Sequence, residues 1–343
     1  MSTFIIAEAG VNHNGDAALA RRLVEVAAES GADAVKFQTF SADKLTAKGA
    51  AKAEYQKRAT GDGDQYDMLK ALEMSEVLHK ELAALSSELG IEFMSTAFDE
   101  DSLDLLVALG IRRIKVPSGE ITNYPFLRYM VRKNLPLIVS TGMADLAEVE
   151  EAIAVIAAER QSCGLSGSLK DIVTVLHCTS NYPAAVEDVN LNAMLTMGKA
   201  TGMPVGYSDH TLGVAVSTAA VAMGARVIEK HFTLDKTMPG PDHAASLDPD
   251  DLKAMVDAIR AVEGALGDGI KAPTASEVPV RALVRRSVTT VRPIAAGSVI
   301  KPSDLTLMRP GTGIAPKDFE AVTGRKAARD IVAGKTLDWV DLQ

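Results

Sequence analysis

The chain has 343 residues, more than a single ordinary core accommodates and enough for two domains. Hydrophobic residues make up 47% and charged residues 24%, as in a packed globular enzyme. The formal net charge of −9 argues against a nucleic-acid partner, because a phosphate backbone requires a basic surface. Any anionic ligand must therefore be held by a few basic side chains placed at its site, because the overall electrostatic field of the protein does not attract it.

Cysteine content and the first residues indicate the compartment. Cys163 and Cys178 give neither a metal-binding spacing nor a disulfide framework, which favours a reducing cytoplasm. Residues 1–8 read as a strand and lack the basic and apolar regions of a signal peptide. Since no apolar run reaches membrane-spanning length, we expect a cytoplasmic protein without a membrane partner.

Short apolar runs alternate with amphipathic helical stretches from residue 4 to about residue 266. Strands are expected at residues 4–7, 34–38, 92–95, 113–116, 137–140, 172–177, 204–208 and 226–231. Helical periodicity lies between them, for example at 17–29, 147–160 and 213–223, and a last helix is expected near 250–266. Eight successive strand–helix units without an obvious hairpin predict an α/β fold of the (β/α)8 TIM-barrel type.

A doubly wound nucleotide-binding sheet is the alternative to a barrel. It would need a glycine-rich phosphate turn directly after a strand. Residues 8–15 (EAGVNHNG) carry their two glycines in the wrong places for that turn. The sequence therefore argues against a nucleotide fold.

Residues 41–74 interrupt the alternation between the second strand and the next helix. This segment is long, polar and charged, and it leaves the C-terminal end of a strand. Because barrel active sites lie at that end, we expect the segment to act as a lid. A tolerated insertion is the alternative.

The pattern changes again after residue 266. Short β-branched runs with Gly and Pro predict a small, mostly β domain, in which residues 294–300 and 331–337 look alike and predict two related turns. We expect a catalytic barrel over residues 1–270, a linker over 271–284 and the small domain over 285–343.

Reactive side chains gather where the predicted strands end. They are Glu8, Lys36, Gln38, Ser95, Thr96, Lys115, Ser118, Glu120, Ser140, Thr141, His177, Ser208, Asp209, His210, Glu229 and His231. Because side chains alternate along a strand, Glu229 and His231 share one face, and Lys230 is expected to point towards the helices or solvent. The C-terminal ends of the strands are where barrel enzymes carry their active sites.

Two histidines, His210 and His231, end neighbouring strands beside Asp209 and Glu229. Two imidazoles there can share one divalent ion with waters and a substrate oxygen. Two protein ligands with open positions suit a Lewis-acid metal, Mn²⁺ or Mg²⁺, better than a closed zinc site. The alternative is that both are hydrogen-bonded core or rim residues.

Two lysines and several serines suit a ligand that carries both a phosphate and a carboxylate. They are Lys36, Lys115, Ser95, Ser118, Ser140 and Ser208. Ordinary surface lysines with solvated heads are the alternative. Glu8 and Asp242 are candidates for a general acid or base, unless they only form ion pairs with the lysines.

The remaining histidines show no such grouping. His79 lies in a helical stretch and reads as a surface residue. His13 and His243 lie on loops without an evident partner. A rival chemistry also stays open at this stage: a Schiff-base aldolase with Lys36 or Lys115 as nucleophile, which would need a lysine with a depressed pKa.

Eight motifs, in chain order, resemble the sialic acid synthases over nearly the whole chain. They are residues 6–15 (IAEAGVNHNG), 35–40 (VKFQTF), 117–120 (PSGE), 140–143 (STGM), 206–210 (GYSDH), 228–235 (IEKHFTLD), 240–243 (GPDH) and 309–313 (RPGTG). The resemblance implies a TIM barrel joined to an antifreeze-like (SAF) domain. It also implies an enzyme that joins phosphoenolpyruvate to N-acetylmannosamine or a close 2-acetamido hexose, giving N-acetylneuraminate or a related nonulosonic acid plus phosphate.

The resemblance also assigns roles. The implied metal ligands are His210 and His231, and the implied general acid/base is Glu8. The expected phosphoenolpyruvate contacts are Lys36, Ser95, Lys115, Ser118, Ser140 and Ser208. The expected sugar contacts are Gln38, Phe98, Glu120, Tyr182, Asp242 and Arg309. Arg309 resembles an arginine that reaches the N-acetyl group in the partner subunit's barrel, which implies a domain-swapped homodimer.

The sequence departs from the family pattern near the sugar. Residues 95–98 read STAF where many relatives have STPF, and residues 177–183 differ from other members at Ser180 and Asn181. The intact motifs 118–120 and 240–243 are closer to the sialic and legionaminic branches than to the pseudaminic branch. A legionaminic acid synthase using 2,4-diacetamido-2,4,6-trideoxymannose is therefore the alternative. A further alternative is that the C-terminal domain alone is a binding module for ice or carbohydrate. The intact group of reactive residues at the strand ends argues against it.

Overall fold

The computed structural model describes residues 2–343. The chain divides into two compact units, Met1–Gly267 and Asp268–Gln343. Within residues 2–343 the structure contains no helix long and apolar enough to cross a membrane.

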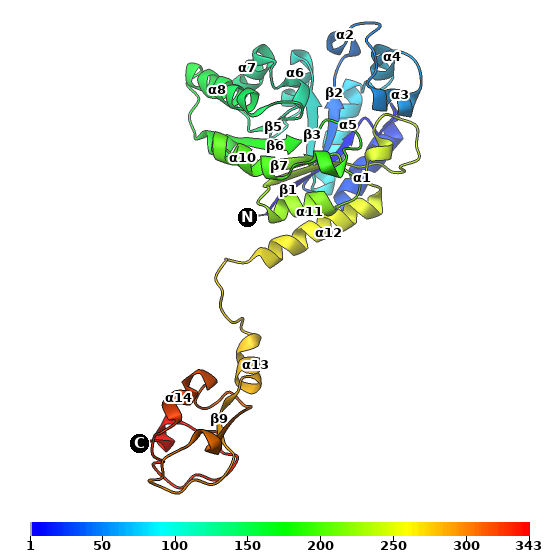
Figure 1. Ribbon diagram of the computed structural model, residues 1–343. Helices are drawn as coiled ribbons and strands as arrows, with labels where there is room; N and C mark the ends of the chain where they lie inside the picture. The colour runs from blue at the N-terminus through cyan, green and yellow to red at the C-terminus, as the bar shows by residue number, and fades with distance from the viewer. Residues whose placement is uncertain (1) are drawn as a thin grey trace. The chain divides into compact units, whose positions relative to one another are not determined.

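The first unit is a closed barrel of parallel strands, which confirms the predicted fold class (Figure 1). The strands are β1 (Phe4–Gly10), β2 (Ala34–Thr39), β3 (Glu92–Ala97), β4 (Ile114–Val116), β5 (Leu137–Ser140), β6 (Val173–Cys178), β7 (Val205–Asp209) and β8 (Val227–His231). β1 pairs with β8 and closes the ring, so that Glu8 lies beside His231.

Helices separate the strands, and most of them begin at a polar N-cap residue. They are α1 (Ala17–Glu29), α2 (Ala42–Leu45), α3 (Glu54–Thr60), α4 (Gln65–Lys70), α5 (Glu76–Leu89), α6 (Glu100–Ala108), α7 (Tyr124–Arg132), α8 (Leu146–Ser162), α9 (Leu169–Ile172), α10 (Asn192–Thr201), α11 (Ala215–Ala222) and α12 (Pro249–Leu266). The side chains of Asp16, Asp145 and Asp248, for example, accept backbone N–H groups at the starts of α1, α8 and α12. The carboxylates satisfy donors that the first helical turn leaves free.

The barrel interior is filled in layers. Its lower layer is an apolar cluster of Ile6, Ala34, Met94, Ile138, Leu176 and Val227. The residues two positions further along the same strands are Glu8, Lys36, Thr96, Ser140, Cys178 and Glu229. Because alternate residues on a strand face the same side, these six also point inward, one layer closer to the C-terminal strand ends.

Gly206 occupies the corresponding lower-layer position on β7. A Cβ atom there would lie 2.4 Å from the Val227 carbonyl oxygen and 2.6 Å from Leu176 Cδ2. Only glycine fits this close approach, and Ser208 follows it in the layer above.

Residues 41–74 are not a structureless loop. They fold into α2, α3 and α4, which lie together at one end of the barrel (Figure 1). Lys52 holds the segment together, because its buried ammonium donates to Thr60 Oγ1 and the Gly61 carbonyl at 2.9 and 3.1 Å. The lid prediction did not anticipate this internal structure.

The second unit contains α13 (Glu277–Val284), β9 (Ser287–Thr290), β10 (Leu305–Met308) and α14 (Phe319–Val322). β9 and β10 pair antiparallel around a small separate core. The two similar segments face each other, since Ile294 and Ile331 each donate a backbone N–H to the other's carbonyl at 2.8 Å. Two aspartates repeat the same role: Asp304 accepts the Lys301 N–H and Asp341 the Asp338 N–H. The unit is therefore built from two related halves.

Candidate active site

A cavity of ≈ 510 Å³ lies at the C-terminal ends of the strands, a size typical of small-molecule sites. Twelve of the residues to which the family resemblance assigns a role line it: Glu8, Lys36, Gln38, Phe98, Lys115, Ser118, Ser140, Tyr182, Ser208, His210, His231 and Asp242. Thr96 and Glu229 line it as well. The barrel thus gathers side chains from almost every strand end at one place.

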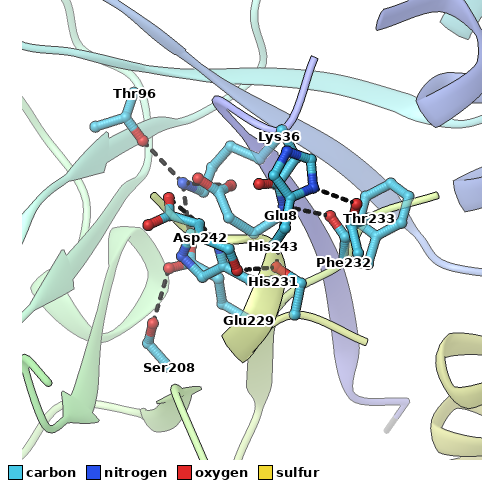
Figure 2. A network of polar contacts seen from close by, with 12 residues as sticks. Glu8, Lys36, Thr96, Ser208, Glu229, His231, Phe232, Thr233, Asp242 and His243 are labelled. Carbon is cyan, nitrogen blue, oxygen red and sulfur yellow. Dashed lines mark hydrogen bonds and ion pairs between the residues drawn. The ribbon is translucent and has the colours of Figure 1, made fainter. Parts of the chain in front are cut away.

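Buried charges form the floor of the cavity (Figure 2). Lys36 Nζ lies 2.7 Å from Glu8 Oε2 and 3.6 Å from Glu229 Oε2, and Lys115 Nζ lies 3.3 Å from Glu229 Oε1. Thr96 accepts from Lys36 at 2.9 Å, and Ser208 donates to Glu229 at 2.8 Å. All these side chains are almost inaccessible, so each charge depends on its neighbours.

The two carboxylates of the floor differ in protonation. Burial raises the pKa of Glu8 to about 7, although Lys36 opposes it. Burial would raise the pKa of Glu229 too, but Lys115 and Lys36 outweigh it and hold that pKa below its ordinary value. Glu229 is therefore the fixed counter-ion, and Glu8 is the carboxyl that can exchange a proton near neutral pH.

Lys36 does not have the depressed pKa that a Schiff-base nucleophile needs. Burial lowers its pKa, but Glu229 and Glu8 outweigh burial and raise it above the ordinary value. Lys36 therefore stays protonated, which suits anion binding and argues against the aldolase chemistry at this residue.

The two histidines come together at one edge of the cavity. Their ring centroids are 5.6 Å apart. His210 Nδ1 lies 2.6 Å from the Thr179 carbonyl, which can only accept, so Nδ1 carries the proton and Nε2 keeps its lone pair. His231 Nδ1 is buried, has no hydrogen-bond partner among residues 2–343, and lies 3.9 Å from Asp242 Oδ2.

This donor set fits a divalent metal ion with open positions. Burial lowers the pKa of His210 and His231, so both imidazoles are neutral, as metal ligands must be. Burial also raises the pKa of Asp242 to about 6. Within the part of the chain that the structure describes, there is no group of three or more His, Cys, Asp or Glu side chains that could hold a metal, so a closed protein cage is absent.

An aromatic stack covers the histidine pair. The Tyr182 ring lies 4.1 Å from the His210 ring and 5.1 Å from the Tyr55 ring, centroid to centroid. Tyr55 belongs to α3, so the segment 41–74 reaches the histidines through Tyr182. Its position over the cavity agrees with the lid interpretation.

Serine hydroxyls line the side of the cavity near β5. Ser140 Oγ is buried and finds no partner within residues 2–343. Ser118 Oγ accepts from the Gly142 N–H at 3.0 Å. A Cβ on Gly142 would lie 2.2 Å from Ser180 Oγ, so glycine allows the close approach of these loops. Such donors suit phosphate or carboxylate oxygens.

Three site predictions are wrong in position. Ser95 faces the surrounding helices, where its hydroxyl lies 2.6 Å from Thr39 Oγ1, and Thr96 takes the inward place because side chains alternate. Glu120 does not line the cavity and accepts from Asn123 at 2.6 Å. Asp209 turns away from the histidines and binds Lys230 at 2.9 Å.

Several other polar side chains also differ from expectation. Lys230 points away from the cavity as expected, but it is fully buried and donates to the Thr211 carbonyl. His79 is buried and not a surface residue; its ring contacts the Ser75 carbonyl and Thr39 Oγ1. His13 accepts from the Gly15 N–H and His243 contacts Thr233, so both have partners.

The expected contact of Arg309 with the sugar stays a prediction, because Arg309 and the cavity belong to different units. Arg309 is an exposed residue of the second unit, next to Pro310. The cavity also contains residues that the sequence did not indicate: Val11, Tyr55, Gln56, Gln65, Met68, Leu69 and Leu72. Most come from the segment 41–74, and no strand periodicity marks them. Thr96 could have been preferred over Ser95 from the alternation of β3 alone.

Fold and site together define a class: a TIM-barrel enzyme whose strand ends carry two buried lysines next to a pair of histidines. Residues 23–271 match the NeuB family and residues 285–343 match the SAF domain. The chain belongs to the NeuB family of synthases.

Named relatives agree with this assignment. The chain is 56% identical to the N,N'-diacetyllegionaminic acid synthase of Legionella pneumophila, over all of this chain and 95% of the relative. The corresponding synthase of Campylobacter jejuni is 47% identical, over 96% of each chain. A solved sialic acid synthetase from Leptospira borgpetersenii in complex with citrate is 33% identical, has a TM-score of 0.71, and shares 82% of this chain and 90% of its own.

Proposed function

We propose that this enzyme condenses phosphoenolpyruvate with 2,4-diacetamido-2,4,6-trideoxymannose to give N,N'-diacetyllegionaminic acid and phosphate. The observation that carries the proposal is the buried floor of Lys36, Lys115, Glu229 and Glu8 beside two neutral histidines. The legionaminic alternative is supported better than N-acetylneuraminate as product. Two legionaminic acid synthases are 56% and 47% identical to the chain, whereas the human N-acetylneuraminate-9-phosphate synthase is 34% identical.

The lysines and hydroxyls bind the anionic substrate. Lys36 and Lys115 share one firm counter-ion, Glu229, because Glu8 is protonated for part of the time near neutral pH. The floor therefore has positive charge available for the carboxylate and phosphate of phosphoenolpyruvate. The hydroxyls of Ser140 and Ser118 add donors in a buried site, where positioning and charge stabilisation contribute most to the rate.

The acceptor aldehyde lies at the histidine edge in this proposal. His210 and His231 would hold a divalent ion, Mn²⁺ or Mg²⁺, which would supply Lewis-acid polarisation of the aldehyde. C3 of phosphoenolpyruvate attacks the aldehyde carbon, water adds to C2, and phosphate leaves by C–O cleavage. Glu8 exchanges a proton with the aldehyde oxygen or the attacking water. Tyr182 closes the site over His210 and excludes solvent.

The second unit is proposed to complete the site of a partner subunit in a domain-swapped homodimer. Support comes from the exposed Arg309 and from apolar side chains exposed on α13, such as Val280 and Leu283. Light scattering is expected to give the mass of a dimer. Arg309→Ala is expected to keep that mass and to raise the KM for the sugar about tenfold or more. A monomer with full activity contradicts this part of the proposal.

The main test is product mass spectrometry. The purified enzyme, Mn²⁺ and phosphoenolpyruvate are incubated in parallel with 2,4-diacetamido-2,4,6-trideoxymannose and with N-acetylmannosamine, while released phosphate is measured. The diacetamido sugar is expected to give the higher kcat/KM. Product from N-acetylmannosamine alone would instead identify an N-acetylneuraminate synthase. No phosphate release with either sugar refutes the proposed class of reaction.

A further inference from the structure

One wall of the cavity is apolar and takes no part in the proposed chemistry. Its members are Val11, Met68, Leu69, Leu72 and Phe98, which all line the cavity. Together with Phe40 and Leu45 they form a hydrophobic cluster separate from the barrel core. We call the five cavity residues the apolar wall.

The apolar wall comes from three distant parts of the chain. Val11 follows β1, Phe98 follows β3, and Met68 and Leu69 lie on α4 of the segment 41–74. Met68 and Leu69 are only half-buried, although both are large and apolar. Both side chains line the cavity, so a ligand bound in the cavity covers their exposed part.

The polar groups near the apolar wall are few and partly used. The Gln56 amide oxygen accepts the Ala53 N–H at 2.9 Å, and the Gln65 amide oxygen accepts from Thr46 Oγ1 at 3.1 Å. Charged side chains line the cavity at the floor and at Asp242, on the loop after β8, and none of them belongs to the apolar wall. The cavity is therefore charged at its floor and apolar along one side. A ligand that fills it must be polar where it meets the floor and apolar where it meets the apolar wall.

We infer that the apolar wall selects acceptor sugars that end in a C6 methyl group over those that end in a C6 hydroxyl. The inference rests on the proposed function, because the reacting aldehyde must lie at the histidines and the charged floor. C6 is the carbon furthest along the chain from that aldehyde. A hydroxyl placed against Met68 and Leu69 loses its water without a new partner, whereas a methyl group gains burial.

The expected preference is moderate. An apolar pocket rejects an added hydroxyl by roughly 10- to 100-fold in kcat/KM, since it offers no clash and only withholds a hydrogen bond. Three glutamines, Gln38, Gln56 and Gln65, also line the cavity, and their amides suit the acetamido groups of the same sugar.

The test compares two acceptors that differ only at C6: 2,4-diacetamido-2,4,6-trideoxymannose and its 6-hydroxy counterpart. The full-length enzyme is saturated with Mn²⁺ and phosphoenolpyruvate, and kcat/KM is measured for each sugar. The native enzyme is expected to prefer the 6-deoxy sugar by about tenfold or more. Equal values for the two sugars overturn the inference while leaving the proposed reaction intact.

Variants of the apolar wall give the second arm. Met68→Gln and Leu69→Asn are expected to reduce the ratio of the two kcat/KM values to about threefold or less, mainly by slowing the 6-deoxy sugar. Leu69→Met, which keeps the side chain apolar, is expected to preserve the ratio. Asp67→Asn is the matched control, because Asp67 is exposed on the same helix and does not line the cavity.

Two readouts separate the possible failures. Thermal unfolding of each variant shows that a changed ratio comes from folded enzyme. A ratio that stays at the native value in both folded polar variants overturns the role of the apolar wall. Absence of phosphate release from both sugars in the native enzyme refutes the proposed function itself, and the inference with it.

Discussion

Both units of the protein hold buried acidic side chains, and the pKa values of two of them, Glu8 and Asp341, shift in opposite directions. In the barrel, burial raises the pKa of Glu8 to about 7. In the second unit, Asp341 has a lowered pKa: burial opposes it, but Lys335, the Asp338 N–H and Arg329 outweigh burial. Asp341 is fully satisfied within its own unit and stabilises it. Glu8 has only a lysine that it shares, which leaves it available for chemistry.

The comparison separates residues that serve the fold from residues that serve the reaction. Backbone N–H groups donate hydrogen bonds to Asp304 and Asp341, and these donors are fixed in place by the folded backbone. The partner of Glu8 is the side chain of Lys36, and the substrate can replace it. The following predictions test this difference, beginning with the largest expected effect.

Removal of metal is expected to abolish turnover. Prolonged chelation followed by desalting should reduce phosphate release to background, because the proposed reaction needs a Lewis-acid ion at His210 and His231. Added Mn²⁺ should restore the rate, and borohydride should trap no sugar or pyruvate on the protein. Activity that survives chelation together with a trapped lysine adduct would establish the aldolase chemistry instead.

Glu8→Gln is expected to lower kcat by about 10²- to 10⁴-fold, the range typical of a lost general acid or base. The free energy of unfolding should fall by about 3 kcal/mol at most, because Lys36 keeps Glu229 as its counter-ion. Steady-state kinetics and denaturant unfolding measure the two effects. A large loss of stability with kcat unchanged would reverse the role assigned to Glu8.

Asp341→Asn is expected to show the opposite balance. It should destabilise the second unit by about 1–3 kcal/mol, because the charge that binds Arg329 and Lys335 is lost. Asp304→Asn should have a smaller effect, since its carboxylate pairs with Arg292 alone. The only tryptophan is Trp339, so its fluorescence reports this unit selectively. The exposed Glu320→Gln is the control, and equal destabilisation by it would show that the position of the charge is unimportant.

The smallest expected effect is the pH dependence of the second unit. Asp341 and Asp304 have lowered pKa values in the folded state, so the stability they provide is present above the ordinary aspartate value of 3.8. It is lost as pH falls below that value and through the folded pKa values. The denaturant midpoint of unfolding, followed by Trp339 fluorescence, should therefore decrease as the pH falls below about 4. The decrease should be less steep in Asp341→Asn. A midpoint independent of pH would contradict this.

Most of the barrel could be predicted from the sequence, because periodicity alone locates a buried strand. The strand at 137–140 agrees with β5 at both ends, and the barrel and the small β unit are confirmed. Errors arose where one residue decides the face. Ser95 is expected at the cavity, yet Thr96 is the inward residue, because side chains alternate along β3.

The remaining differences depend on contacts between distant segments. His79 reads as exposed on its helix, yet Thr39 of β2 covers it. The apolar wall joins Val11, Met68 and Phe98, and no local pattern brings these together. Roles of the individual site residues stay predictions, since location in the cavity does not establish what each side chain does.

The layered interior of the barrel has a consequence for how such an enzyme changes its substrate. Ile6, Met94 and Ile138 plug the barrel one layer below Glu8, Thr96 and Ser140. Because the plug is complete without the reactive layer, mutations above it alter chemistry without opening the core. Directed evolution for new acceptors can therefore leave the strands alone and vary α3 and α4, where a library of a few positions changes the shape of the substrate site.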